Sequence, residues 1–204
     1  MENSNEINVN GKQETYCVKK EIFMKIWQLD FEVDKYDNLI PEKNFTLDEI
    51  RSFNGKKKKW KWKPLPVKRM EPEKNLELSD APGFFTIPVF SDRALKVLRP
   101  IIKNSTEELR LICKEKKYYA INVTKVLDVV DYSKAEYIKF SDGNRIMVFE
   151  KYAFRICDEL VQNNIFKIID EPLRRAFVSE KFKNAVEENN LTGFKFRLVW
   201  DSEE

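Results

Sequence analysis

Lysine and tryptophan alternate in one short stretch, and this combination of residue types could bind a charged partner. Between Lys56 and Arg69 there are eight basic residues and no acidic one. Lysine neutralises phosphate groups, and tryptophan rings stack on bases or lie at a membrane interface. The candidate partner-binding residues of this stretch are Lys56, Lys57, Lys58, Lys59, Trp60, Lys61, Trp62 and Lys63.

Three interpretations of this stretch stay open. In the first, residues 56–69 form a nucleic-acid-binding module. In the second, they contact an acidic protein partner. The third needs no function: the stretch is a solvated loop or an edge strand, in which Trp60 and Trp62 share a face toward the core while the lysines face water and deter edge pairing.

The chain contains no histidine, and this absence limits the chemistry that it could perform. Histidine is the commonest general base near neutral pH and the commonest transition-metal ligand. Without it, Ser-His and Cys-His nucleophile pairs cannot form. The three cysteines, Cys17, Cys113 and Cys157, lie too far apart in sequence to form a typical zinc motif, and their odd number argues against a disulfide framework.

Carboxylates and glycines also give little support to an enzymatic site. Acidic pairs such as Glu107-Glu108 and Asp170-Glu171 are adjacent in sequence, and neighbouring helix residues do not face each other. The five glycines are isolated, so no phosphate-binding glycine loop is expected. We therefore expect a protein that is not an enzyme, with no cofactor and no metal.

Length and hydropathy indicate a folded cytoplasmic protein. The chain has 204 residues, 42% of them hydrophobic, and its apolar runs are far shorter than the ~20 residues of a membrane helix. The first residues are polar and lack the features of a signal peptide. We expect no membrane partner, a flexible segment at residues 1–20, and a single domain at 21–204 that includes an irregular basic and proline-containing segment at 54–80.

Alternating apolar residues predict several strands. Residues 21–31 resemble a strand buried on both faces, and residues 137–140 and 145–149 flank an Asp-Gly turn that is typical of a β-hairpin. Residues 165–169 predict another strand. In the last strand, at 194–200, we expect the side chains of Phe194, Phe196, Leu198 and Trp200 on one face.

Two helices are predicted to cover the sheet. Ser91 and Ser179 are good N-caps, and they precede apolar stripes that end near residues 103 and 189. A shorter helical turn follows Thr46, with Glu49 three residues further on, as in a capping box. The pattern predicts an α+β fold: a single domain with a mostly antiparallel sheet covered by a few helices.

The C-terminal residues carry a resemblance to a known family. Phe177-Val178-Ser179-Glu180-Lys181-Phe182, followed by Leu191-Thr192-Gly193-Phe194-Lys195-Phe196, resembles the closing pattern of a family of bacterial immunity proteins that are encoded beside polymorphic toxins. The resemblance covers residues ~80–200 and not residues 1–78. Its residues Ser179, Glu180, Phe182, Leu191, Thr192, Gly193 and Phe194 also have an ordinary structural explanation, as a helix cap, core contacts and a turn.

The resemblance implies a function but no catalytic residue. It implies an immunity protein that binds one cognate toxin in the cytoplasm and blocks its active site or substrate-binding site. Such a protein needs only a complementary surface with buried aromatic anchors and a charged rim. The nucleic-acid-binding module at residues 56–69 is the alternative.

Overall fold

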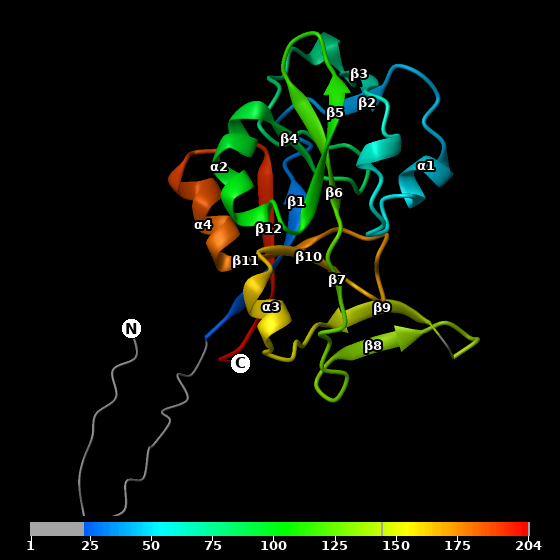
Figure 1. Cartoon of the computed structure of the whole chain (residues 1–204), viewed down its shortest axis with the longest axis vertical. Helices are drawn as coiled ribbons and strands as arrows, with labels where there is room; N and C mark the ends of the chain where they lie inside the picture. The colour runs from blue at the N-terminus through cyan, green and yellow to red at the C-terminus, as the bar shows by residue number, and fades with distance from the viewer. Residues whose placement is uncertain (1–22, 144, 204) are drawn as a thin grey trace, which may run out of the picture.

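Two five-stranded sheets and one two-stranded hairpin make up most of the described structure (Figure 1). The computed structural model describes residues 23–143 and 145–203. The segment predicted to be flexible, residues 1–20, lies outside the described residues. All but two of the strand pairings within the sheets are antiparallel, and helices pack against the strands. The predicted α+β fold is confirmed.

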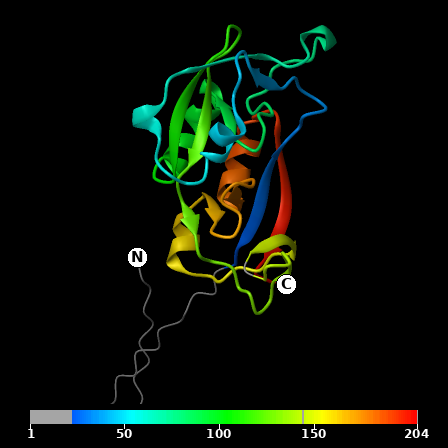
Figure 2. The same cartoon turned by 90° about the vertical axis from the view of Figure 1, so that its right-hand side faces the viewer.

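The first sheet joins the two ends of the described chain. Its strands, in order, are β12 (Phe194–Asp201), β1 (Lys25–Phe31), β11 (Phe177–Ser179), β10 (Ile165–Ile168) and β7 (Val126–Leu127). Figure 2 shows β1 and β12 side by side as the two longest strands of this sheet. Strands from the beginning and the end of the chain are therefore neighbours.

Strand β1 is buried on both faces, as its sequence predicts. Ile26 belongs to an aromatic cluster with Phe166 and Phe177, whereas Leu29 and Phe31 belong to a second cluster beneath the helices. Because successive side chains of a strand point to opposite faces, this sheet must be covered on both sides.

Helices α2 (Asp92–Ile102) and α4 (Glu180–Glu188) pack against each other and cover one face of the first sheet. The predicted caps are confirmed: Ser91 Oγ accepts a hydrogen bond from the Ala94 amide, and Ser179 Oγ accepts one from the Phe182 amide. The core beneath them also includes Ile121 of the second sheet. This shared core joins the two sheets.

The opposite face of the first sheet is covered by α3 (Asp158–Gln162) and by the hairpin of β8 (Glu136–Lys139) and β9 (Ile146–Lys151). The predicted Asp-Gly hairpin is confirmed. Stacked aromatic rings fill the space between hairpin and sheet, with the ring centroids of Phe149 and Tyr152 4.9 Å apart.

The predicted single apolar face of the last strand is wrong in its second half. Leu198 is 40% exposed, while Val199 and Trp200 pack against the aromatic cluster. The register between β1 and β12 shifts at this point, since Ile26 lies opposite Trp200 and Trp27 lies opposite Leu198. A β-bulge therefore adds Val199 to β12 and interrupts the alternation.

The second sheet contains strands β2 (Leu39–Pro41), β3 (Leu65–Arg69), β5 (Thr106–Ile112), β6 (Tyr118–Val123) and β4 (Val89–Ser91), in that order. Part of residues 54–80, predicted to be irregular, thus forms β3 between two neighbours. Pro66 lies near the start of β3, and the 3-10 helices η1 (Lys59–Lys61) and η2 (Pro72–Lys74) flank the strand.

Helix α1 (Leu47–Arg51) has the predicted capping box, in which Thr46 Oγ1 accepts from the Glu49 amide and the Glu49 carboxylate accepts from the Thr46 amide. In the described part of the chain, no helix is long and apolar enough to cross a membrane.

Candidate partner-binding surface

The eight basic residues between Lys56 and Arg69 divide into three groups. Arg69 turns inward and donates through Nε to the buried carboxylate of Asp37, at 2.8 Å. Lys58 is half-buried, with its amino group 3.8 Å from the centroid of the Phe53 ring. The other six are exposed, and none forms an ion pair with another described residue: Lys56, Lys57, Lys59, Lys61, Lys63 and Lys68.

The two tryptophans do not share a face, so the third interpretation is wrong in placing both toward the core. Trp60 is 76% exposed, and the amino group of Lys61 lies 4.3 Å from its ring centroid. Trp62 packs against the core of the second sheet and donates through Nε1 to the Arg110 carbonyl at 2.9 Å. The 3-10 turn at Lys59–Lys61 replaces the expected strand geometry and separates the two side chains.

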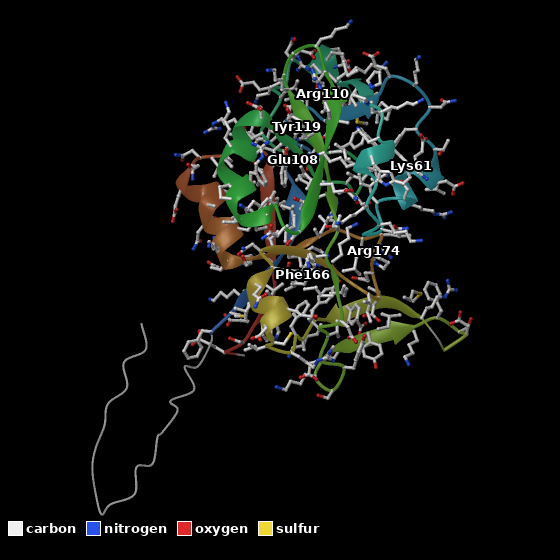
Figure 3. The ribbon with its side chains drawn as sticks, in the orientation of Figure 1. Lys61, Glu108, Arg110, Tyr119, Phe166 and Arg174 are labelled. Atoms are coloured by element: carbon white, nitrogen blue, oxygen red, sulfur yellow. The ribbon has the colours of Figure 1, made fainter. Side chains whose placement is uncertain are left out.

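We call residues 56–63 the Trp60 loop. It lies on the side of the second sheet away from α2, and Figure 3 shows Lys61 on this side, beyond the strand that carries Glu108 and Arg110. The loop contains six lysines and both tryptophans of the stretch.

The backbone of the Trp60 loop is fastened to the second sheet by one carboxylate. Glu107 Oε2 accepts hydrogen bonds from the amides of Lys58 and Lys59, at 2.8 and 3.3 Å, and from the Asn122 side chain at 3.0 Å. Asn122 Nδ2 also donates to the Lys56 carbonyl at 2.9 Å. The loop conformation is therefore set by the sheet beneath it.

Lys58 differs from its neighbours because its side chain helps to hold the loop. Its amino group donates to Ser52 Oγ. Burial lowers the pKa of Lys58, against the opposing influence of the carboxylates of Glu49 and Glu107. Of the six lysines in the loop, Lys58 is the one whose side chain packs inward, against Phe53 and Ser52.

A more deeply buried lysine bonds to the chain just before the loop. Lys167, in β10, is 3% exposed, and its amino group donates to the carbonyls of Phe53 and Pro172 at 2.8 and 2.9 Å. Burial lowers the pKa of Lys167 to about 8. This residue was not predicted, although a single lysine within the apolar run at 165–169 was a visible signal.

The first half of the C-terminal motif lies at the start of α4. Ser179 caps the helix and donates through Oγ to the Asn164 side chain at 2.8 Å. The Glu180 carboxylate accepts a hydrogen bond from the Trp27 indole, and Phe182 is fully buried in the core. Ser179, Glu180 and Phe182 therefore all contact other residues of the same chain, as expected for structural residues.

The second half of the motif meets a buried carboxylate. Asp80 is 1% exposed and accepts hydrogen bonds from Ser91 Oγ at 2.7 Å and from the Thr192 amide at 3.2 Å. Arg93 forms an ion pair with the same carboxylate, and the Lys116 amino group lies 3.8 Å from it. We call this group the Asp80 junction.

Electrostatics at the Asp80 junction favour the ionised acid. Burial raises the pKa of Asp80, but hydrogen bonds from Ser91 and Thr192 and the charges of Lys116 and Arg93 outweigh burial and leave the pKa below its ordinary value. Arg93 also donates to the carbonyls of Asn189 and Asn190, at the end of α4. The junction thus connects α2, α4 and the turn before β12.

The remaining motif residues pack around this junction. Leu191 and Phe194 are buried in the core beneath the helices. Gly193 has φ +84°, and a Cβ atom there would lie 2.2 Å from Ser79 Oγ. Glycine is required at this position both by the backbone angle and by the space.

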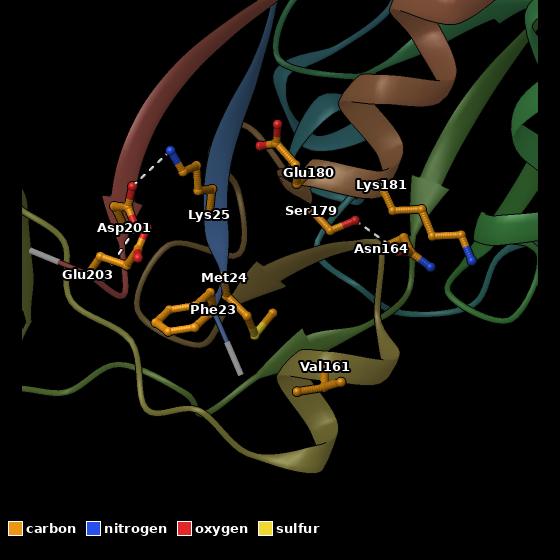
Figure 4. Close-up of a pocket in the computed structure, with 10 residues that line it drawn as sticks. All are labelled: Phe23, Met24, Lys25, Val161, Asn164, Ser179, Glu180, Lys181, Asp201 and Glu203. Atoms are coloured by element: carbon orange, nitrogen blue, oxygen red, sulfur yellow. Dashed lines mark hydrogen bonds and ion pairs between the residues drawn. The ribbon is translucent and has the colours of Figure 1, made fainter. Parts of the chain in front are cut away.

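A shallow pocket of about 380 Å³ opens beside the start of β1 (Figure 4). Four of the polar side chains in its wall are paired: Lys25 forms an ion pair with Asp201 at 3.1 Å, and Ser179 donates a hydrogen bond to Asn164. Among the described residues, no group of three or more Cys, Asp or Glu side chains could hold a metal ion.

Comparison with known proteins identifies a family. The model of a family described as "Immunity protein family (Imm11)" matches residues 3–201. The match includes residues below 80, which the resemblance noted from the sequence did not cover. No curated protein matches the chain.

Proposed function

The chain belongs to the Imm11 immunity protein family, and we propose on this basis that it binds a cognate bacterial toxin in the cytoplasm and neutralises it by occluding the active site or substrate-binding site. The observation that carries the proposal is the family match, which spans nearly the whole chain. In this proposal the protein acts by binding and is not an enzyme.

The arrangement of polar groups supports a binding role. At the Asp80 junction, and between Lys25 and Asp201 beside β1, charged groups are paired within the fold. In the Trp60 loop, five exposed lysines and one exposed tryptophan lack such partners among the described residues. Protein interfaces are built from aromatic anchors with a charged rim, and this loop offers both.

A second candidate function is a nucleic-acid-binding module at residues 56–69. The observation in its favour is the exposed Trp60 ring among lysines, since bases stack on such rings and lysines neutralise phosphates. Its affinity for single-stranded DNA or RNA would fall steeply with salt.

The proposed function is tested by growth protection together with affinity capture. The tagged chain is expressed in its native host, bound proteins are identified by mass spectrometry, and the recovered partner is expressed in bacteria with and without the chain. We expect a stoichiometric protein whose toxicity disappears when the chain is present. Recovery of nucleic acid alone, with no protection from the product of the adjacent gene, would favour the second candidate.

A further inference from the structure

We propose that the Trp60 loop is the surface that contacts the toxin, and that it fits an acidic face of the toxin with an apolar recess for the Trp60 ring. This inference rests on the proposed function and specifies where on the molecule it resides and what chemistry the partner presents.

The exposed tryptophan is the first argument. An indole ring that is 76% exposed leaves a large apolar surface in water, whereas Trp62, two residues away, is packed against the core. Tryptophan is strongly enriched among the residues that dominate binding energy at protein interfaces. Trp60 is therefore placed to serve as an anchor that becomes buried when a partner binds.

The charge of the loop is the second argument. Six of its eight residues are lysines, and five of these are exposed without an ion pair to any described residue. Like charges this close repel each other, and an acidic partner surface would relieve that repulsion. The whole chain has a net charge of only +3, so the positive field of this loop is local.

The loop is also held in place before binding. Glu107 and Asn122 fix its backbone, Lys58 and Trp62 fasten it from within, and Lys167 holds the Phe53 carbonyl just before it. A surface that is already ordered loses less conformational entropy when it binds. An aromatic anchor on such a loop can contribute much of its contact energy to affinity.

The surroundings favour a protein partner over a nucleic acid. Proteins that bind single strands present successive aromatic platforms along a continuous basic groove. Here only one of the two tryptophans of the loop is exposed, so the loop offers a single aromatic platform. One anchor with a bounded basic rim is the arrangement of a protein contact.

The test uses the full chain and the purified toxin recovered by affinity capture, with association and dissociation rates measured at several salt concentrations. Trp60→Ala should weaken binding by about 30-fold. Replacing Lys57, Lys59, Lys61 and Lys63 together by Gln should slow association by about tenfold at low salt and flatten its salt dependence.

A matched control removes four exposed lysines elsewhere, Lys103, Lys134, Lys151 and Lys195, by the same substitution to Gln. Its association rate should stay within about threefold of the original, because short-range complementarity at the loop is retained. Thermal unfolding of every variant shows whether the fold is intact.

Each outcome decides the proposal. If both loop variants fold and bind the toxin as the unchanged chain does, the Trp60 loop is not the contact surface, while the proposed function stands. If the unchanged chain fails to bind or protect, both proposals fall. Binding of each chain to a mixed-sequence single-stranded oligonucleotide is measured in parallel. If the lysine variant binds the toxin as the unchanged chain does but no longer binds the oligonucleotide, the loop binds nucleic acid and the proposal is overturned.

Discussion

The Asp80 junction and the Trp60 loop use charge in opposite ways. At the junction, a buried carboxylate is surrounded by a serine, a threonine and two cations, all held by the fold. In the loop, lysines and a tryptophan face outward with no ion pair to a described residue. The residues that carry the family resemblance are therefore engaged within the fold, whereas the loop presents charged groups that lack internal ion pairs.

The largest expected effect comes from breaking the Asp80 junction. Asp80→Ala should lower the free energy of unfolding by about 3 kcal/mol, because it leaves cations and hydroxyl groups without their buried acceptor. Urea denaturation followed by circular dichroism measures the change. The control Asp92→Ala removes an exposed partner of Lys96 and should cost less than about 1 kcal/mol. Equal losses in the two variants would contradict a special role for the junction.

Gly193→Ala tests the same region through the backbone. The substitution should destabilise the protein by about 2 kcal/mol, since alanine is strained at φ +84° and its Cβ would collide with Ser79. Gly143→Ala is the matched control: its φ is +69°, but nothing lies within 4 Å of the added Cβ. The melting temperature of Gly193→Ala should therefore be lower than that of Gly143→Ala, and the difference measures the cost of the collision with Ser79. Equal melting temperatures would mean that Ser79 moves away freely.

The buried Lys167 should make stability depend on pH. Its pKa of about 8 in the folded state lies below that of an unfolded chain, so unfolding takes up protons above pH 8. Stability attributable to Lys167 therefore increases as pH rises, by about 1 kcal/mol between pH 7 and pH 9. The measurement is the difference in unfolding free energy between the unchanged chain and Lys167→Met.

The comparison with Lys167→Met is needed because other groups titrate in a neighbouring pH range. Burial raises the pKa values of Tyr118 and Tyr152, which lowers stability as pH approaches 10. Both chains share that decline, so it cancels. Parallel pH profiles for the two chains would show that Lys167 does not carry the effect.

The smallest expected effect is on the stability of the lysine variant of the Trp60 loop. Replacing Lys57, Lys59, Lys61 and Lys63 by Gln should change the free energy of unfolding by less than about 0.5 kcal/mol, as is usual for exposed positions. Lys58→Gln should cost more, because its amino group lies over Phe53 and bonds to Ser52. Equal effects would remove the distinction between inward and outward lysines.

Much of the fold follows from local sequence patterns. The caps at Thr46, Ser91 and Ser179, the Asp-Gly hairpin and the doubly buried first strand depend on residues close together in the chain, and each was predictable. The bulge in β12 and the 3-10 turn at Trp60 were not, because both interrupt a regular alternation without changing residue types.

The residues of the candidate site were predictable from the sequence, but the hydrogen bonds that hold them in place were not. The stretch of lysines and tryptophans was visible in the sequence. Its attachment to the sheet, however, depends on Glu107 in β5 and Asn122 in β6, which are far away along the chain. In the same way, no spacing rule connects Asp80 with Thr192, since they meet only when the two helices and β12 are in place.

Hydrogen exchange followed by mass spectrometry, with and without the toxin, shows whether the Trp60 loop is the contact surface. We expect amides of residues 56–63 to become protected in the complex, while amides of residues 191–194, already held at the Asp80 junction, change little. Protection confined to other surfaces, with residues 56–63 exchanging as fast in the complex as in the free chain, would contradict it.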